Sequence, residues 1–161
     1  MINIRTNVFE TNSSSSHSIT IPYPLELNEN EMEINEDGYI EVSLSQFCHW
    51  EHESQMDRLA WLIQLLANEK LGYNPFWYHR NDEHWHELAE KLYATEEFQE
   101  LSAEIADYAS CRGIVLAELT SGYIDHDSNY ESMKIFLLEY GVDAVSFVFG
   151  NGIEMMFEFN G

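Results

Sequence analysis

The stretch SQMDRLAWLIQLLANEKLG, residues 54–72, contains a start signal, an apolar repeat and a stop signal for one helix. Ser54 is of a favoured N-cap type, and Gly72 is typical of the position that follows a helix. Between them, apolar residues recur every three or four positions, at Met56, Leu59, Leu62, Ile63 and Leu66. This spacing predicts a helix that packs one face on a core.

Three further helices are predicted after this one, at about residues 83–93, 95–108 and 130–140. The first should turn inward Trp85, Leu88, Ala89 and Leu92. The second, capped by Thr95, should bury Phe98, Leu101, Ile105 and Tyr108. Asp127 or Ser128 is the expected cap of the third, and Gly141 its stop.

The two ends of the chain have the composition of strands. MINIRTNVF (residues 1–9) alternates apolar and polar residues, and HSITI (17–21) is a second short run. YIEVSLS (39–45) and GIVLAEL (113–119) are further strand candidates. Near the C-terminus, β-rich runs at 142–149 and 153–159 flank Asn151-Gly152, a dipeptide typical of hairpin turns. These two runs are therefore predicted as paired strands.

Strands at both ends with helices between them predict the α+β class. The chain has 161 residues, 45% of them hydrophobic, which is enough for one core. We expect a single domain over residues 1–161, with a mostly antiparallel sheet from N- and C-terminal strands and about four helices between them.

The charge of the chain is strongly negative. Asp and Glu number 29 against 7 Lys and Arg, which gives a formal net charge of −22. Such a field repels nucleic acid and anionic lipid and attracts basic surfaces. No Lys or Arg occurs between Arg5 and Arg58. We therefore expect a basic partner, and no direct contact with nucleic acid or membrane.

The acidic segment 25–57 has two interpretations, an extended protruding arm or an edge strand followed by a turn at Asp37-Gly38. A solvated face is the ordinary role of such a run. Its carboxylates could instead imitate the phosphate row of a nucleic acid and dock on a Lys/Arg groove. The expected contact residues are Glu26, Glu29, Glu31, Glu33, Glu36, Asp37 and Glu41.

The histidine-rich stretches do not form a complete metal motif. Zinc requires converging N and S ligands. CHWEHE (residues 48–53) and HRNDEHWHE (79–87) match neither a paired Cys motif nor His-Glu-x-x-His. In DHDSN (125–129) the calcium-loop pattern fails, because Tyr130 and Phe136 stand where Gly and Glu are needed. Structural or surface histidines are favoured, and we expect no metal and no cofactor.

The run ETNSSSSHS, residues 10–18, lies between two strand candidates. Its hydroxyls suit a polar turn, since Ser side chains bond readily to nearby main chain. It lacks the surroundings of a serine nucleophile or a phosphate loop. An alternative function, a metal-dependent hydrolase or transferase, would need a polar pocket that combines Ser14, Ser15, Ser16, His17, Asp125 and His126.

The opening FETNSSSSHS resembles a run near the start of small phage and mobile-element proteins of low-GC Gram-positive bacteria. GYIDHDS (122–128) and FVFGN (147–151) are similar to the C-terminal half of that group. The resemblance covers both ends of the chain but not the helical middle or the acidic segment. It implies a mobile-element context rather than a mechanism, and a shared core that includes Ser13–His17 with Asp125 and His126.

The composition is also similar to that of anti-CRISPR proteins and DNA mimics that inhibit restriction enzymes. Together these features predict an inhibitor, not an enzyme, whose acidic surface binds the basic groove of a host defence protein, either an RNA-guided nuclease or a restriction enzyme. With two cysteines and no secretory signal, the expected location is the cytoplasm of the host cell. A homodimer or an oligomeric phage component is a further alternative.

Overall fold

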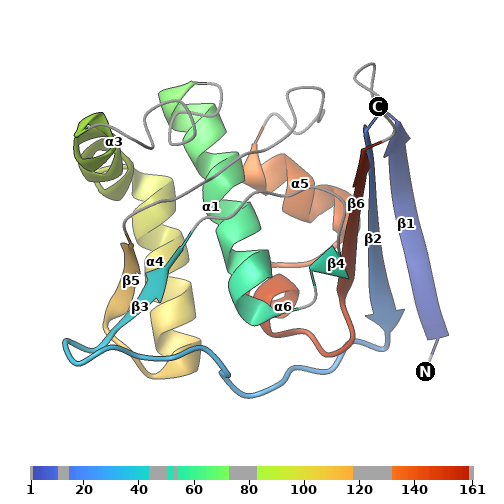
Figure 1. Ribbon diagram of the computed structural model, residues 1–161. Helices are drawn as coiled ribbons and strands as arrows, with labels where there is room; N and C mark the ends of the chain where they lie inside the picture. The colour runs from blue at the N-terminus through green and yellow to red at the C-terminus, as the bar shows by residue number, and fades with distance from the viewer. Residues whose placement is uncertain are drawn as a thin grey trace.

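A computed structural model describes residues 2–10, 15–43, 51–52, 54–72, 83–117 and 132–159 of the protein. Its elements are β1 (Ile2–Glu10), β2 (Ser15–Tyr23), β3 (Tyr39–Val42), β4 (Glu51–His52), α1 (Gln55–Leu71), α3 (His84–Tyr93), α4 (Glu96–Ala109), β5 (Gly113–Leu116), α5 (Met133–Tyr140), α6 (Ala144–Phe149) and β6 (Glu154–Phe159). Figure 1 shows the strands of the two chain ends on one side of the helices, and β3 with β5 on the other. The α+β prediction is confirmed.

Helix α1 lies at the centre of the molecule (Figure 1). The Ser54 hydroxyl accepts a hydrogen bond from the Asp57 amide at 3.0 Å, and Gly72 follows the helix with a φ of 98°. Both predicted ends are therefore confirmed. Residues 58–67 are all buried, because α1 packs against α3, α4, α5, α6 and β3. The apolar repeat correctly predicted the helix but showed only part of its buried surface.

The antiparallel sheet has the order β1-β2-β6-β4. Its register places Ile4 opposite Ile21 and Ile19 opposite Met155. This confirms the predicted sheet from the chain ends. Strand β2 begins at Ser15, so part of the serine run is strand rather than turn.

Strands β3 and β5 form a separate parallel pair, with Ile40 beside Ile114. The outer edge of β5 is closed by side chains. The Ser102 hydroxyl accepts from the Ile114 amide at 2.9 Å, and the Tyr93 hydroxyl accepts from the Leu116 amide at 2.8 Å. A parallel pair could not be predicted from the sequence because three helices, α1, α3 and α4, lie between its two strands in the chain.

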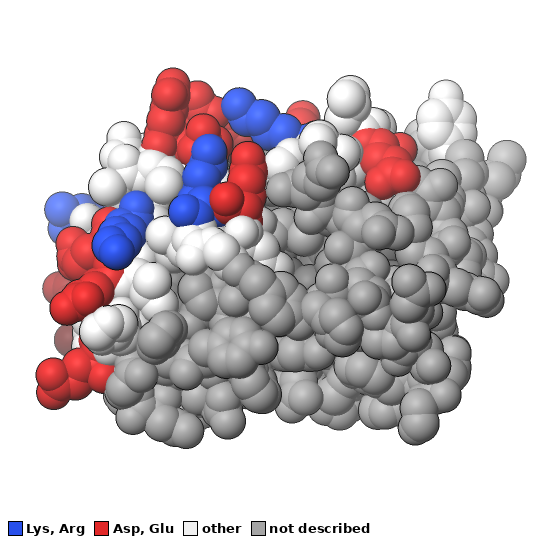
Figure 2. Space-filling view, turned by 90° about the horizontal axis from the view of Figure 1, so that it is seen from above, with Lys and Arg blue, Asp and Glu red and all other residues white. Residues whose placement is uncertain are grey.

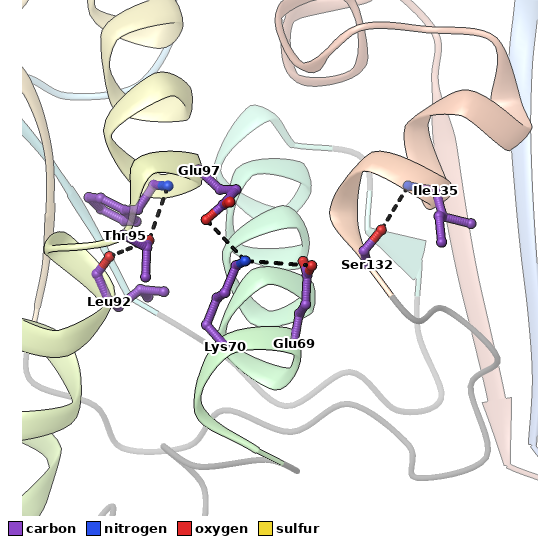
Figure 3. Close-up of polar contacts among 8 residues, drawn as sticks. Glu69, Lys70, Leu92, Thr95, Glu97, Ser132 and Ile135 are labelled. Carbon is purple, nitrogen blue, oxygen red and sulfur yellow. Dashed lines mark hydrogen bonds and ion pairs between the residues drawn. The ribbon is translucent and has the colours of Figure 1, made fainter.

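The predicted caps were right for α4 and wrong for α5. The Thr95 hydroxyl accepts from the Phe98 amide at 3.2 Å. Helix α5 is capped by Ser132, whose hydroxyl accepts from the Ile135 amide at 3.0 Å (Figure 3), and not by Asp127 or Ser128. Several hydroxyl and carboxylate residues precede this helix, and local sequence does not decide which of them adopts the capping geometry.

Of the two strands predicted for a hairpin at the C-terminus, the first is wrong and the second is confirmed. Residues 144–149 form helix α6, while the second run is strand β6. The Asp143 carboxylate accepts from the Ser146 amide at 2.7 Å and so caps α6. Residues Ala144, Phe147 and Val148 are buried at helical spacing against α1 and α4. Tertiary packing therefore overrides the β propensity of the valines and phenylalanines.

Candidate protein-binding surface

The acidic segment, defined here as residues 25–41, leads from the end of β2 into β3 along one border of the molecule (Figure 1). All seven predicted contact residues are exposed in the structure: Glu26, Glu29, Glu31, Glu33, Glu36, Asp37 and Glu41. Residues 25–38 form neither a helix nor a regular strand. Of the segment 25–57, residues 44–50 and 53 lie outside the described part of the chain.

The first part of this segment is hydrogen-bonded to the turn between α6 and β6. The Asn28 amide donates to the Phe149 carbonyl and the Asn151 amide donates to the Glu26 carbonyl, both at 2.7 Å. From α4, the Tyr108 hydroxyl donates to the Asn28 carbonyl at 2.7 Å. Tyr108, predicted to point inward, is instead 37% exposed, because its ring packs on Phe149 beside this segment.

The middle of the segment is held by the first turn of α1. The Gln55 side chain is 4% exposed. It donates to the Glu29 carbonyl at 2.9 Å and accepts from the Glu31 amide at 2.7 Å. Next to this bridge, Met32 is buried in the core at 8% exposure. The main chain is thereby fixed while the neighbouring carboxylates face solvent.

The last part of the segment is a turn closed by Asn35. Its side-chain oxygen accepts from the amides of Asp37 and Tyr39, at 3.0 and 2.9 Å. Arg112 covers this turn, with its guanidinium 5.0 Å from the centre of the Tyr39 ring. The guanidinium donates to the Asp37 carbonyl at 3.2 Å, not to the Asp37 carboxylate.

None of the seven carboxylates forms an ion pair with any residue that the structure describes. By contrast, Lys70 and Lys134, away from this segment, have acidic neighbours. Figure 2 shows one such face, seen from above, where Lys and Arg side chains lie among Asp and Glu. Lys70 at the end of α1 lies 3.2 Å from Glu97 and 3.8 Å from Glu69 (Figure 3). The cation-free sequence interval thus becomes an acidic surface whose seven carboxylates form no ion pair with a described basic side chain, although Arg112 bonds to its main chain.

Carboxylates also line a hollow of about 290 Å³ between α4 and α5. Burial raises the pKa of Glu104, and the nearby charges of Asp143 and Glu100 raise it further. The pKa of Glu97 is lowered, first by a hydrogen bond from the main-chain amide at the helix start and then by Lys70. This hollow therefore has a mixed charge, since Lys134 also lines it.

Replacing Glu104 by glutamine is expected to stabilise the protein slightly at pH 7. Because the pKa of Glu104 is raised in the folded protein, the folded state keeps its proton at pH values just above 4.5, the ordinary pKa, where the unfolded chain has lost it. The free energy of unfolding therefore falls as the pH rises above 4.5. The gain should be only about 1 °C in Tm, because solvent screens this mostly exposed group. It should vanish below pH 4. Thermal unfolding at pH 7 and below pH 4 measures this gain in Tm, with Asp107→Asn as the control on α4. An equal gain in Tm at the two pH values would contradict the raised pKa of Glu104.

A second hollow, of about 470 Å³, lies within the acidic surface itself. It is lined by Glu33, Ile34, Asn35, Glu36, Glu41, Ser43 and Met56. Three of the predicted contact residues therefore share one concave site. Apolar side chains at Ile34 and Met56 give this site a non-polar part.

Half of the six residues of the predicted polar pocket lie outside the described residues. Ser15, Ser16 and His17 belong to β2, opposite Phe159, Glu158 and Phe157 of β6. Ser14, Asp125 and His126 lie in parts of the chain that the structure does not describe. The enzyme alternative, which needs these residues together, stays a prediction.

Among the described residues, no group of three or more His, Cys, Asp or Glu is placed to hold a metal ion. His84 and His86 are both exposed on α3. Cys48, His49 and His79 are outside the described ranges. Of the helices described, none is long and apolar enough to cross a bilayer.

Gln55 and Arg58, which hold the acidic segment and the turn beside it, were not predicted as site residues from the sequence. Arg58 is 3% exposed, and its guanidinium donates to the Val148 carbonyl at 2.7 and 3.1 Å. It also donates to the carbonyls of Gly150 and Ile153, both at 3.3 Å. A signal was present, because Arg58 lies four residues before Leu62 and therefore on an inward face of the helix.

Compared with protein-family models, curated proteins and solved structures, the chain matches none of them. The function therefore has to be inferred from the geometry and charge of the surface.

Proposed function

We propose that this protein inhibits a bacterial defence nuclease by occupying the basic groove in which that nuclease holds nucleic acid. The observation that carries the proposal is the acidic surface. Its seven carboxylates are exposed, and none is paired with a described cation. The partner would be an RNA-guided nuclease or a restriction enzyme, since both bind a polyanion through Lys and Arg side chains.

The hydrogen bonds that hold the acidic segment favour a role in binding a partner over a role as a merely solvated face. A flexible acidic tail would lose conformational entropy when it docked, which lowers affinity. Here the main chain is already held by Phe149, Asn151, Gln55 and Tyr108. Binding would therefore order only the carboxylate side chains.

The electrostatic field supports the same class of partner. A net charge of −22 accelerates the approach of a basic surface and repels nucleic acid and anionic membranes. Docked carboxylates would replace DNA phosphates in the groove, and the association would weaken steeply with salt. The cytoplasm of the host cell is the compartment in which such an inhibitor would meet its target.

The test is displacement of a labelled target duplex from a purified nuclease, measured for one guide-loaded RNA-guided nuclease and one restriction enzyme. Titration with this protein should release DNA from at least one of them at 50 mM salt. The apparent affinity should fall at least about tenfold at 200 mM, because several charge contacts are made together. Polyglutamate at the same carboxylate concentration is the control. Retention of DNA by both enzymes, or equal displacement by polyglutamate, would contradict the proposal.

A further inference from the structure

The outer edges of β3 and β5 differ in the hydrogen bonding of their main-chain groups. Alternate residues of a parallel strand turn their main-chain groups to opposite sides, and Val42 faces β5, since its carbonyl accepts from the Ala117 amide at 3.0 Å. Tyr39 faces outward, where Asn35 bonds to both its amide and its carbonyl, at 2.9 and 2.8 Å. Glu41, two residues further, faces the same outer side.

At Glu41 this edge has no partner within the described part of the chain. Among the residues that the structure describes, none forms a hydrogen bond with the outward main chain of Glu41. On β5 the outward amides of Ile114 and Leu116 donate to the hydroxyls of Ser102 and Tyr93. An open strand edge is a template for another extended chain.

The second hollow, which lies within the acidic surface, is beside this edge, because Glu41 and Ser43 line it together with Glu33 and Glu36. Its volume of about 470 Å³ is enough for a long side chain. A Lys or Arg could place its aliphatic stem against Met56 and its charge among the carboxylates. The two features therefore select the same ligand, an extended chain with basic side chains.

We propose that the outer edge of β3 accepts an extended, basic segment of the partner protein as an added strand, with a Lys or Arg in the hollow. The proposal rests on the proposed function and specifies how part of the basic partner binds. Main-chain hydrogen bonds would supply affinity and the hollow would supply specificity. A second copy of this chain is disfavoured as the occupant, because its own net charge is −22.

The probe is a capped octapeptide of alternating valine and lysine, added to the ¹⁵N-labelled protein at low salt. Calorimetry should detect binding, and the Glu41 amide should become protected from hydrogen exchange. Two versions of the peptide, N-methylated at every valine or at every lysine, keep the charge but each block one edge. One version should bind at least tenfold more weakly and the other as the parent does, since only one edge of the peptide pairs with β3.

The matched protein variants are Ser43→Pro and Ser43→Ala. Ser43 is exposed, and proline removes an outward donor but leaves the bond between Val42 and Ala117 in place. Proline should weaken peptide binding at least tenfold, and alanine should not change it. Equal binding of both methylated peptides would overturn strand addition. Strand addition by a partner would also be overturned if the protein alone had a doubled mass in light scattering and its Glu41 amide were already protected from exchange. The edge would then be occupied by a second copy of the chain. In either case DNA displacement by the protein would still be expected, so failure of the edge proposal can be told apart from failure of the proposed function.

Discussion

Replacing Arg58 by alanine is expected to lower the free energy of unfolding by roughly 3–5 kcal/mol. The substitution would leave the carbonyls of Val148, Gly150 and Ile153 without their guanidinium donor in a site that is 3% exposed. Val148 and Gly150 stand at the end of α6, where carbonyls have no partner within the helix. Urea unfolding followed by circular dichroism measures the loss.

The matched control is Arg112→Ala. Arg112 is exposed and makes one cation–π contact and one hydrogen bond to the Asp37 carbonyl, so its loss should cost only about 1 kcal/mol. If Arg58→Ala does not fold, Arg58→Lys serves instead; it keeps the charge but loses the planar fork of donors, and it should be intermediate. Equal unfolding midpoints for Arg58→Lys and Arg112→Ala would contradict the role assigned to Arg58.

The same substitution tests how the acidic surface is held. Arg58 bonds to the turn that includes Gly150, and that turn bonds to the acidic segment through Asn151 and Phe149. In Arg58→Lys the amides of Asn28 and Asn151 should exchange with solvent faster than in the parent protein. Unchanged exchange would mean that the segment is held independently of Arg58.

Reversal of four carboxylates in the acidic segment should abolish displacement of DNA from the nuclease. The variant Glu29→Lys, Glu31→Lys, Glu33→Lys, Glu36→Lys puts like charges against the basic groove, which should weaken binding at least about 100-fold. The fold should be unchanged, because all four side chains are exposed and the bonds of Gln55 reach only main chain. The measurement is the displacement titration at low salt.

The control reverses four exposed carboxylates on α3 and α4, at Glu87, Glu90, Glu100 and Asp107. Each reversal adds two positive charges, so four reversals change the net charge of either variant from −22 to −14. If location matters, the control should displace DNA within about threefold of the parent, a difference that reflects long-range charge alone. Equal loss in both variants would show that net charge, rather than this surface, is responsible.

Much of the fold could be predicted because its signals are local. Ser54 and Gly72 mark α1, Thr95 marks α4, and the alternating residues before Ser15 mark the first strand. The errors arise where two local structures were both acceptable. The apolar spacing of residues 144–149 suits a buried strand as well as a helix, and packing against α1 and α4 decided for α6.

The acidic residues of the candidate surface could be predicted from the sequence, but the residues that hold them in place could not. Every acidic residue chosen from the sequence is exposed, because a cation-free run of carboxylates has no favourable way to be buried. The residues that hold the run in place come from distant parts of the chain. Tyr108 and Asn151 contact Asn28 from 80 and 123 residues away in the sequence, and no local pattern reveals such pairs.

The sequence by itself determined the class of the fold, the positions of most helices and the sign of the acidic surface, since propensity, capping and charge act over a few residues. Only the tertiary structure decided that β3 pairs in parallel with β5 and that, among the described residues, none bonds to its outer edge at Glu41. It also decided that Arg58 and Gln55 turn inward to hold the turn after α6 and the acidic segment. These features depend on which surfaces meet when the core closes around α1, and that is a property of the whole chain.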